Sequence, residues 1–405
     1  MNKPVREISN WRLGQADDVV ARQRVATRQG RCRRERLSRE QSSSGKLRGS
    51  PLLTYPAKLL VAALALCGEA HGQSYTFEKL VPPAGVGETA PEFLTNTGRI
   101  FGGRSTPFEF LPGRRPRVIT ALESFGPEYG LVAATDEGTL VAMGFNHNDA
   151  DQETQALYVL RKGDSRVRVF NPPLGEEGGY RWDDIYSVFV GSNGDLHGRV
   201  SINLPRQSDD HSERFLFATY RYQVSTGRVS VDLTRDLLAR NRAGMEVVGP
   251  SRRSDEGWNF AVDIRTSVIP LKEPKALGSL DGARFRMNEA GDVVFGGSGT
   301  NCYLWRAGEY DRRPIALGDG TRCNARAITA GHILLSLGGE DEPREWIVYE
   351  LGGQTPISVV DGVEELRPFR FIDLTAMNDR GQIVGVGSRD EGDSPSVQFL
   401  LNPRL

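Results

Sequence analysis

Histidine and cysteine are scarce in this sequence, which has five histidines and four cysteines among its 405 residues. Zinc sites need three or four such ligands at short spacing, as in His-Glu-x-x-His or paired Cys-x-x-Cys motifs. Neither motif occurs, and His147, His197, His211 and His332 are far apart in the chain. The sequence therefore predicts no zinc site, and we expect each of these histidines to be structural.

Motifs for nucleotide and acyl-transfer chemistry are also missing. The Gly-rich stretch Gly296–Thr300 lacks the Gly-Lys-Ser/Thr ending of a phosphate loop. It also lacks the last glycine of a nucleophile elbow. Single-stranded nucleic acid needs basic residues interleaved with aromatics, whereas Arg312, Arg313 and Arg322 are few and balanced by nearby acids. We therefore predict no catalytic residue, no cofactor site and no nucleic-acid partner.

One acidic loop raises the question of calcium. Gly144–Gln155 places Asn146, Asp149, Asp151 and Glu153 within eight residues, and such oxygen-rich loops can bind Ca²⁺. The spacing does not match an EF-hand loop, and the glycine of its sharp turn is absent. A solvated loop between strands is the favoured interpretation, so we predict no metal site here.

Long hydrophobic runs are absent as well. The apolar run Leu59–Leu66 is far shorter than the roughly 18 residues that cross a bilayer. A lysine precedes it and the small residues Ala70 and Gly72 follow, which is the order of a secretory signal cleaved after Gly72. A buried core helix is the alternative. Lipid attachment at Cys67 is disfavoured, because Leu66 stands where a lipoprotein signal has a small residue.

Charge divides the chain at the same place. Residues 1–72 contain 14 Lys and Arg against 6 Asp and Glu, whereas residues 73–405 contain 37 against 46. We predict that residues 1–56 are a basic, disordered tail or lie upstream of the true start, and that 57–72 are the signal peptide. Residues 73–405 then form one exported, periplasmic or extracellular domain, which we expect to be monomeric. Its acidic balance disfavours a polyphosphate partner.

A short phrase recurs along this domain. "MNDRGQIVGVGS" (Met377–Ser388) nearly repeats "MNEAGDVVFGGS" (Met287–Ser298), and weaker copies precede and lie between them. An Asn or Asp followed closely by Gly predicts a tight turn, and the β-branched residues that follow predict a buried strand. The central glycines are Gly98, Gly138, Gly194, Gly244, Gly291, Gly331 and Gly381, with 40 to 56 residues between neighbours. A competing turn at Gly257 makes the fourth copy the least secure.

Two further apolar runs follow several of the turns. The first kind is rich in aromatic residues: Phe108–Gly113, Ala156–Gly163, Cys302–Gly308, Glu345–Gly353 and Val397–Pro403. The second kind is shorter: Arg115–Thr120, Val167–Pro173, Arg313–Gly320 and Thr355–Val360. Three or four short strands per unit is the pattern of a β-propeller blade. A β-sandwich is the alternative, but it does not need seven matching turns.

The two ends of the domain are complementary. The last unit stops at Val397–Pro403 without its final strand, and an isolated strand, Tyr75–Leu80, begins the domain. If Tyr75–Leu80 completes the last unit, no edge strand is left unpaired. The sequence therefore predicts an all-β fold, a β-propeller of seven blades closed by pairing of the N- and C-terminal strands.

The stretch Ala276–Gly308 resembles the extracellular HAF repeats of bacterial proteins. Those repeats combine a Leu-Gly-x-Leu-x-Gly stretch, an Ile-Asn-x-x-Gly-x-Val-Val-Gly turn and a His-Ala-Phe-Leu-Trp strand. The match is good over Ala276–Pro403 and weaker over Leu94–Gly257. The His-Ala-Phe tripeptide itself is absent, since its positions hold Asn301-Cys302-Tyr303 and Val397-Gln398-Phe399. The resemblance implies a secreted, propeller-like protein, and it implies no established activity.

Cys302 and Cys323 are the two cysteines of the predicted exported domain. An even pair in an oxidising compartment favours a structural disulfide, which would close a loop of about 21 residues. Two unpaired buried thiols are the alternative. Neither cysteine has a neighbour at metal-site spacing, and the sequence shows no base that would make either one a nucleophile.

These patterns favour a secreted, non-catalytic binding or scaffold module with an unknown extracellular ligand, either glycan or protein. Propellers present loops at the mouth of a ring, and the longest here are Asn146–Gln155, Asn203–Arg214 and Glu340–Arg344. One alternative is a polysaccharide hydrolase or lyase that uses loop carboxylates. Another is a structural surface or adhesion protein.

Overall fold

The protein is described from a computed structural model. It describes residues 74–81, 90–103, 106–125, 130–147, 153–171, 181–203, 215–250, 263–264, 284–296, 301–309, 315–317, 323–338, 345–353, 356–389 and 396–404. All of these residues belong to one compact unit, Gly72–Leu405. The predicted tail and signal peptide lie outside the described residues.

Within the described residues the strands form seven antiparallel sheets, six with four strands and one with three. The first sheet contains β2 (Pro91–Leu94), β3 (Ile100–Gly102), β4 (Phe108–Phe110) and β5 (Arg117–Val118). The second contains β6 (Gly130–Ala134), β7 (Leu140–His147), β8 (Glu153–Leu160) and β9 (Arg168–Phe170). The third contains β10 (Arg181–Val190), β11 (Leu196–Asn203), β12 (Phe215–Gln223) and β13 (Arg228–Asp232). The three-stranded sheet is β14 (Arg235–Arg240), β15 (Glu246–Pro250) and β16 (Asp263–Ile264).

The remaining sheets are β17 (Arg284–Met287), β18 (Val293–Gly296), β19 (Cys302–Trp305) and β20 (Ile315–Leu317); β21 (Cys323–Ile328), β22 (His332–Leu337), β23 (Glu345–Glu350) and β24 (Ile357–Ser358); and β25 (Phe371–Met377), β26 (Ile383–Ser388) and β27 (Val397–Pro403) with β1 (Tyr75–Lys79). Two short helices, α2 (Thr120–Glu123) and the 3₁₀ helix η2 (Glu364–Leu366), lie in connections.

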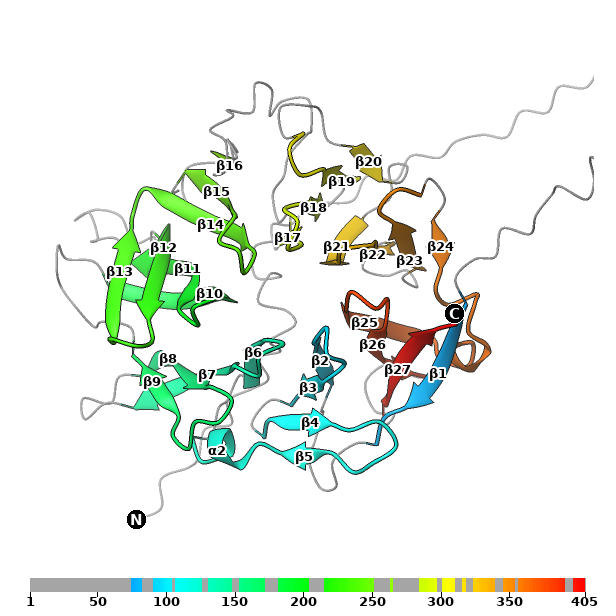
Figure 1. The fold of residues 1–405 in the computed structure, drawn as a ribbon, viewed down its shortest axis with the longest axis horizontal. Helices are drawn as coiled ribbons and strands as arrows, with labels where there is room; N and C mark the ends of the chain where they lie inside the picture. Colours follow the sequence, from blue (N-terminus) through cyan, green and yellow to red (C-terminus); the bar gives the residue numbers. More distant parts are fainter. Residues whose placement is uncertain are drawn as a thin grey trace, which may run out of the picture. The chain divides into compact units, whose positions relative to one another are not determined.

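The sheets follow one another around a common centre, with first strands such as β2, β6 and β25 inside and last strands such as β5, β9 and β24 outside (Figure 1). This arrangement is a β-propeller, so the predicted all-β propeller fold is confirmed. Six sheets are complete blades of four strands. The seventh sheet, β14–β16, has three strands in the described part of the chain, so that part shows six complete blades and the predicted seven are not found there.

The repeated phrase forms the turn between the first two strands of each sheet. In six of the seven turns the central glycine has a positive φ, between +73° and +94°, which strains any residue with a Cβ. Its N–H donates to the carbonyl three residues earlier, as Gly381 does to Asn378 at 2.9 Å. The turn at Gly331 is shorter, because Thr329 N–H bonds His332 O directly at 2.8 Å. The predicted turns are therefore confirmed, with one variant.

The glycine that ends the phrase allows the first and second strands of a sheet to approach each other closely. The first strand of six sheets has an irregular register, which is the mark of a β-bulge. A Cβ on Gly385 would lie 2.6 Å from Asp373 O, and one on Gly198 would lie 1.9 Å from Ser187 O. These positions accept only glycine, because a carbonyl of the first strand, close to the bulge, occupies the space of a side chain.

The turns also fasten neighbouring sheets together. Asn378, which is buried, donates from Nδ2 to Thr95 O of the adjoining sheet at 3.0 Å. Asp379 N–H donates to Asn96 Oδ1 at 2.9 Å, and Asn96 N–H donates to Asp136 Oδ1 at 2.6 Å. The Asn and Asp residues of the phrase therefore shape their own turn and also bind the next one.

Hydrophobic clusters fill five of the junctions between sheets. They join β2–β5 to β6–β9, β14–β16 to β17–β20, β17–β20 to β21–β24, β21–β24 to the sheet of β25–β27, and that sheet to β2–β5. Trp305 and Trp346 are among their fully buried members. Between β6–β9 and β10–β13, Phe170 stacks on Tyr222 with ring centres 4.4 Å apart. The core therefore lies between blades, where each sheet packs on the next.

The first and last described strands pair with each other. Strand β1 pairs antiparallel with β27, from Tyr75 opposite Pro403 to Lys79 opposite Phe399. Tyr75 is buried, and the Phe77 ring packs against Phe399 with centres 5.3 Å apart. The first and last described strands thus complete one sheet.

Candidate functional site

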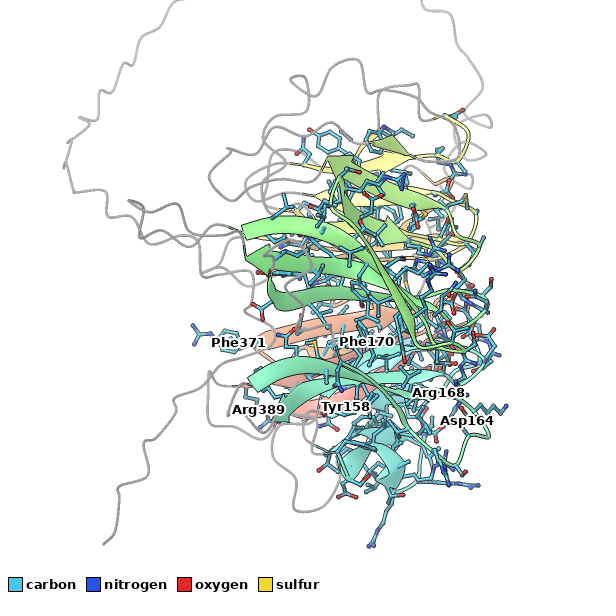
Figure 2. The ribbon with its side chains drawn as sticks, turned by 90° about the vertical axis from the view of Figure 1, so that its left-hand side faces the viewer. Tyr158, Asp164, Arg168, Phe170, Phe371 and Arg389 are labelled. Atoms are coloured by element: carbon cyan, nitrogen blue, oxygen red, sulfur yellow. A yellow bond between two sulfur atoms is a disulfide. The ribbon has the colours of Figure 1, made fainter. Side chains whose placement is uncertain are left out.

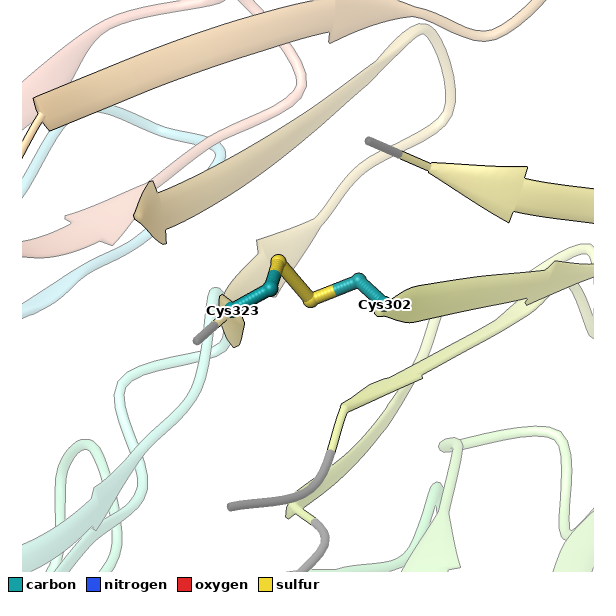
Figure 3. Close-up of a disulfide and its surroundings, with 2 residues drawn as sticks. All are labelled: Cys302 and Cys323. Carbon is teal, nitrogen blue, oxygen red and sulfur yellow. A yellow bond between two sulfur atoms is a disulfide. The ribbon is translucent and has the colours of Figure 1, made fainter. Parts of the chain in front are cut away.

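The predicted disulfide is present. Cys302 Sγ and Cys323 Sγ are bonded at 2.03 Å, and the bond joins the start of β19 to the start of β21 in the next sheet (Figure 3). Both residues are buried. A Cβ on Gly296 would lie 2.7 Å from Cys302 Sγ, so this glycine makes room for the bridge. The bond is a fastening between two sheets.

The loops proposed as binding loops are largely outside the described residues. Of Asn146–Gln155, the structure describes the strand ends, and of Asn203–Arg214 it describes Asn203 alone. Glu340–Arg344 and both aspartates of the calcium hypothesis, Asp149 and Asp151, also lie outside. The loop hypothesis therefore stays a prediction.

The propeller has two faces, which Figure 2 shows from the side. Phe371, the first residue of β25, and Arg389, which follows β26, lie on one side. Asp164, in the turn between β8 and β9, lies on the other. Arg161 of that same turn donates to Gly194 O, in a turn of the repeated phrase, at 3.3 Å. We call this side the turn face.

A cleft of about 840 Å³ opens between sheets β10–β13 and β14–β16. One wall is formed by β11, β12 and β13, and the other by β14 and the turn after it. The turns of the two sheets meet there, because Ser192 N–H donates to Arg242 O at 3.3 Å. The volume lies within the usual range of small-molecule sites.

Four arginines line the cleft, and a carboxylate holds each of them. The pairs are Arg221 with Asp195 (Nη2–Oδ2, 3.0 Å), Arg235 with Asp232 (Nε–Oδ2, 3.2 Å), Arg240 with Glu246, and Arg242 with Glu137 (Nη2–Oε1, 2.6 Å). Arg221 and Arg242 have the more exposed side chains, at 45% and 35%. A guanidinium has five N–H donors, so a paired arginine can still bind a ligand.

His197 lies in the same cleft, on β11 opposite Arg221 of β12. Burial lowers its pKa to about 4, and the positive charges of Arg240 and Arg221 act in the same direction. The charge of Asp195 acts the other way and is outweighed. The imidazole is therefore neutral near pH 7, with one nitrogen donating and the other accepting.

The wall behind the cleft is polar as well. Arg199, two residues along β11 from His197, pairs with the buried Asp236 of β14 at 2.8 Å. Its guanidinium lies over the Phe217 ring, 3.9 Å from the ring centre. Charged pairs therefore contribute to this junction.

Sequence reasoning missed this cleft and assigned His197 a structural role. A signal was nevertheless present. His197, Arg199 and Ser201 alternate along β11 and Asp195 directly precedes it, which places polar side chains on one face of this strand. A strand of a propeller core is expected to bury apolar residues on both faces, so this alternation marks a polar junction.

Two searches of the described part of the chain found nothing. No group of three His, Cys, Asp or Glu side chains there could hold a metal ion. No helix there is long and apolar enough to cross a membrane.

The comparisons with known proteins bear on the fold alone. No family model matches the sequence, and no curated protein matches it. The β-propeller domain of the Trilobed protease from Pyrococcus furiosus is 10% identical with a TM-score of 0.42, over 67% of this chain and 82% of that one. YCF48 bound to D1 peptide is 14% identical with a TM-score of 0.42, over 83% and 96%.

A puromycin-hydrolyzing peptidase from Mycobacterium tuberculosis is 13% identical with a TM-score of 0.43. The match covers 78% of this chain and 54% of the peptidase. At such identities the likeness concerns the propeller fold and carries no statement about ligand or activity.

Proposed function

We propose that this chain is an exported, non-catalytic binding module and that the cleft beside His197 binds its ligand. The observation that carries the proposal is the set of arginines lining the cleft, each already held by a carboxylate. Side chains that are ordered before binding lose little conformational entropy when a ligand arrives. A preformed cleft in a rigid fold is the usual setting of a small-ligand site.

The scaffold of this module is a closed ring of seven blades in the proposal, with β14–β16 counted as one blade. The pairing of β1 with β27 supports closure, and so does the bond from Asn378 Nδ2 to Thr95 O between the last sheet and the first. A ring fastened in this way would hold the two walls of the cleft at a constant distance.

Export is supported by the disulfide, because such bonds persist in oxidising compartments. The signal-like segment 57–72 and the resemblance to extracellular HAF repeats support it as well. The mass of the protein recovered from its native compartment tests this part. Removal of residues 1–72 is expected, and an intact N-terminus on a cytoplasmic protein would contradict it.

A polysaccharide hydrolase is the second candidate, and loop carboxylates that it could use, such as Asp149 and Asp151, lie outside the described residues. Its general acid would need a carboxyl group with a raised pKa. Burial raises the pKa of Glu109, but Arg99 and Arg117 outweigh it, and the net pKa is lowered. The hydrogen bond from Thr234 lowers the pKa of Asp232 in the cleft. Both shifts are opposite to that requirement.

The experiment is a glycan and peptide array with the purified protein and two matched variants. Ala243 and Ala290 are exposed and occupy equivalent positions in two turns, but only Ala243 lines the cleft. Ala243→Trp should abolish binding because the indole fills the opening, and Ala290→Trp should bind like the unchanged protein. Equal binding by both variants would contradict the site, and an array without any hit would contradict the function.

A further inference from the structure

We propose that the ligand of the cleft is an acidic glycan, bound through the carboxylate of a uronic-acid residue. This inference rests on the proposed function and adds the chemical class of its ligand. It follows from two properties of the cleft: its paired arginines and the polar groups of its rim.

The charged pairs of the cleft favour carboxylate groups, which carry one negative charge each, over a single group that carries two. Four arginines line it against two carboxylates, Asp232 and Glu246, and His197 is neutral. Asp195 and Glu137 pair with the other two arginines, so the four ion pairs together are close to neutral. A single carboxylate fits the forked N–H donors of an arginine, whereas a phosphate dianion would meet stronger repulsion from the two lining carboxylates.

The more exposed arginines mark where the carboxylate would bind. Arg221 is anchored from behind by the buried Asp195, and Arg242 is anchored by Glu137 on the turn face. Arg240 is more enclosed, with 14% of its side chain exposed. Arg221 and Arg242 can therefore present their outward N–H groups to a ligand without losing their internal partners.

The rim favours hydroxyl groups over apolar side chains. Ser192, Asn193 and Ser230 are exposed and line the cleft, and they offer both donors and acceptors. Asp232 and Glu246 add acceptors for the hydroxyls of a sugar. Tyr220, the aromatic residue of the lining, is fully buried, and Leu233, which is 36% exposed, adds an apolar edge.

The test measures binding of a trigalacturonate by calorimetry at neutral pH. Its probes for comparison are the uncharged trigalactose, an acidic tripeptide of glutamate, and inorganic phosphate. We expect the trigalacturonate to bind and the trigalactose to bind at least about tenfold more weakly, because the charged hydrogen bonds are lost. The affinity should also fall with added salt, since the arginines are partly exposed.

Arg242→Gln is the decisive variant, because its partner Glu137 is exposed and folding should tolerate the change. It should weaken trigalacturonate binding about tenfold, with Ala290→Trp unchanged. Equal binding of the neutral and acidic sugars would overturn the inference, and so would no binding of the acidic sugar. Binding of the tripeptide or phosphate alone, abolished by Ala243→Trp, would overturn the glycan assignment and retain the proposed function. Binding of any probe that Ala243→Trp leaves intact would overturn both.

Discussion

At the scale of single residues, His197 links the cleft to pH. Its pKa is about 4 in the folded protein, against 6.5 when exposed, so the unfolded chain binds the proton more tightly. The stabilising contribution of neutral His197 is therefore complete above pH 6.5 and is lost as the pH falls through 4. A shift of this size corresponds to roughly 3 kcal/mol in total.

We predict that the free energy of unfolding, measured with urea, falls by about 1 kcal/mol between pH 7.5 and 5.5. In His197→Gln this slope should be absent, because glutamine does not titrate. The lowered pKa values of Glu109 and Asp232 cost stability only below their ordinary values of 4.5 and 3.8. An equal slope in both proteins over this window would show that another group is responsible.

The residue scale also shows where sequence reasoning ends. The turn at Gly381 was predictable, because its Asn, Gly and β-branched residues are neighbours in the chain. The surroundings of His197 were not, because Arg221 and Arg240 are brought to it by strand pairing and by packing of the next sheet. Local signals predict turns, whereas a site assembled from distant strands needs the register of each sheet.

At the scale of elements, the disulfide joins β19 to β21 across a junction of two sheets. Its loop of 21 residues predicts a contribution of about 3 kcal/mol, because the bridge restricts the unfolded chain. We predict that reduction lowers the thermal midpoint by roughly 5 °C. Differential scanning calorimetry with and without dithiothreitol measures the shift.

The matched control is the double variant Cys302→Ala with Cys323→Ala. It should unfold at the midpoint of the reduced protein and should not respond to the reductant. The prediction would be contradicted if the thermal midpoint of the unchanged protein did not respond to the reductant even though free thiols were detected.

Strands with strong patterns were predictable, and weakly patterned ones were not. The aromatic runs became β4, β8, β19, β23 and β27, and the shorter third runs contain β5, β9, β20 and β24. The outer strands of sheets β10–β13 and β14–β16 were not identified. In β12, Thr219 and Arg221 interrupt the apolar pattern because they face the cleft. The residues that line the candidate site therefore made this strand harder to recognise from the sequence.

At the scale of the whole molecule, β1 is the element on which the last sheet depends. Its Tyr75 is buried, and the side chain of Phe77 packs on Phe399. We predict that deletion of residues 74–79 costs at least about 3 kcal/mol, because a buried aromatic residue is lost together with the ladder to β27. Urea denaturation of the deleted and the full chain measures the difference.

A synthetic peptide of residues 73–81 should restore much of the lost stability to the deleted chain. The same peptide with Thr76→Ala should act equally well, since Thr76 is exposed, whereas one with Tyr75→Ala and Phe77→Ala should not. Full stability of the deleted chain without any peptide would contradict the role given to β1.

The pairing of β1 with β27 has a consequence for synthesis. Thr76 and Asn402 are hydrogen-bonded in the finished sheet, although they are 326 residues apart in the chain. A ribosome therefore makes β1 first among the strands of this sheet and β27 last. Until β27 has been made, β26 has a free edge where β27 belongs, and nascent chains on one message could pair there with each other. Chains truncated before β27 should therefore aggregate more readily than chains that contain it.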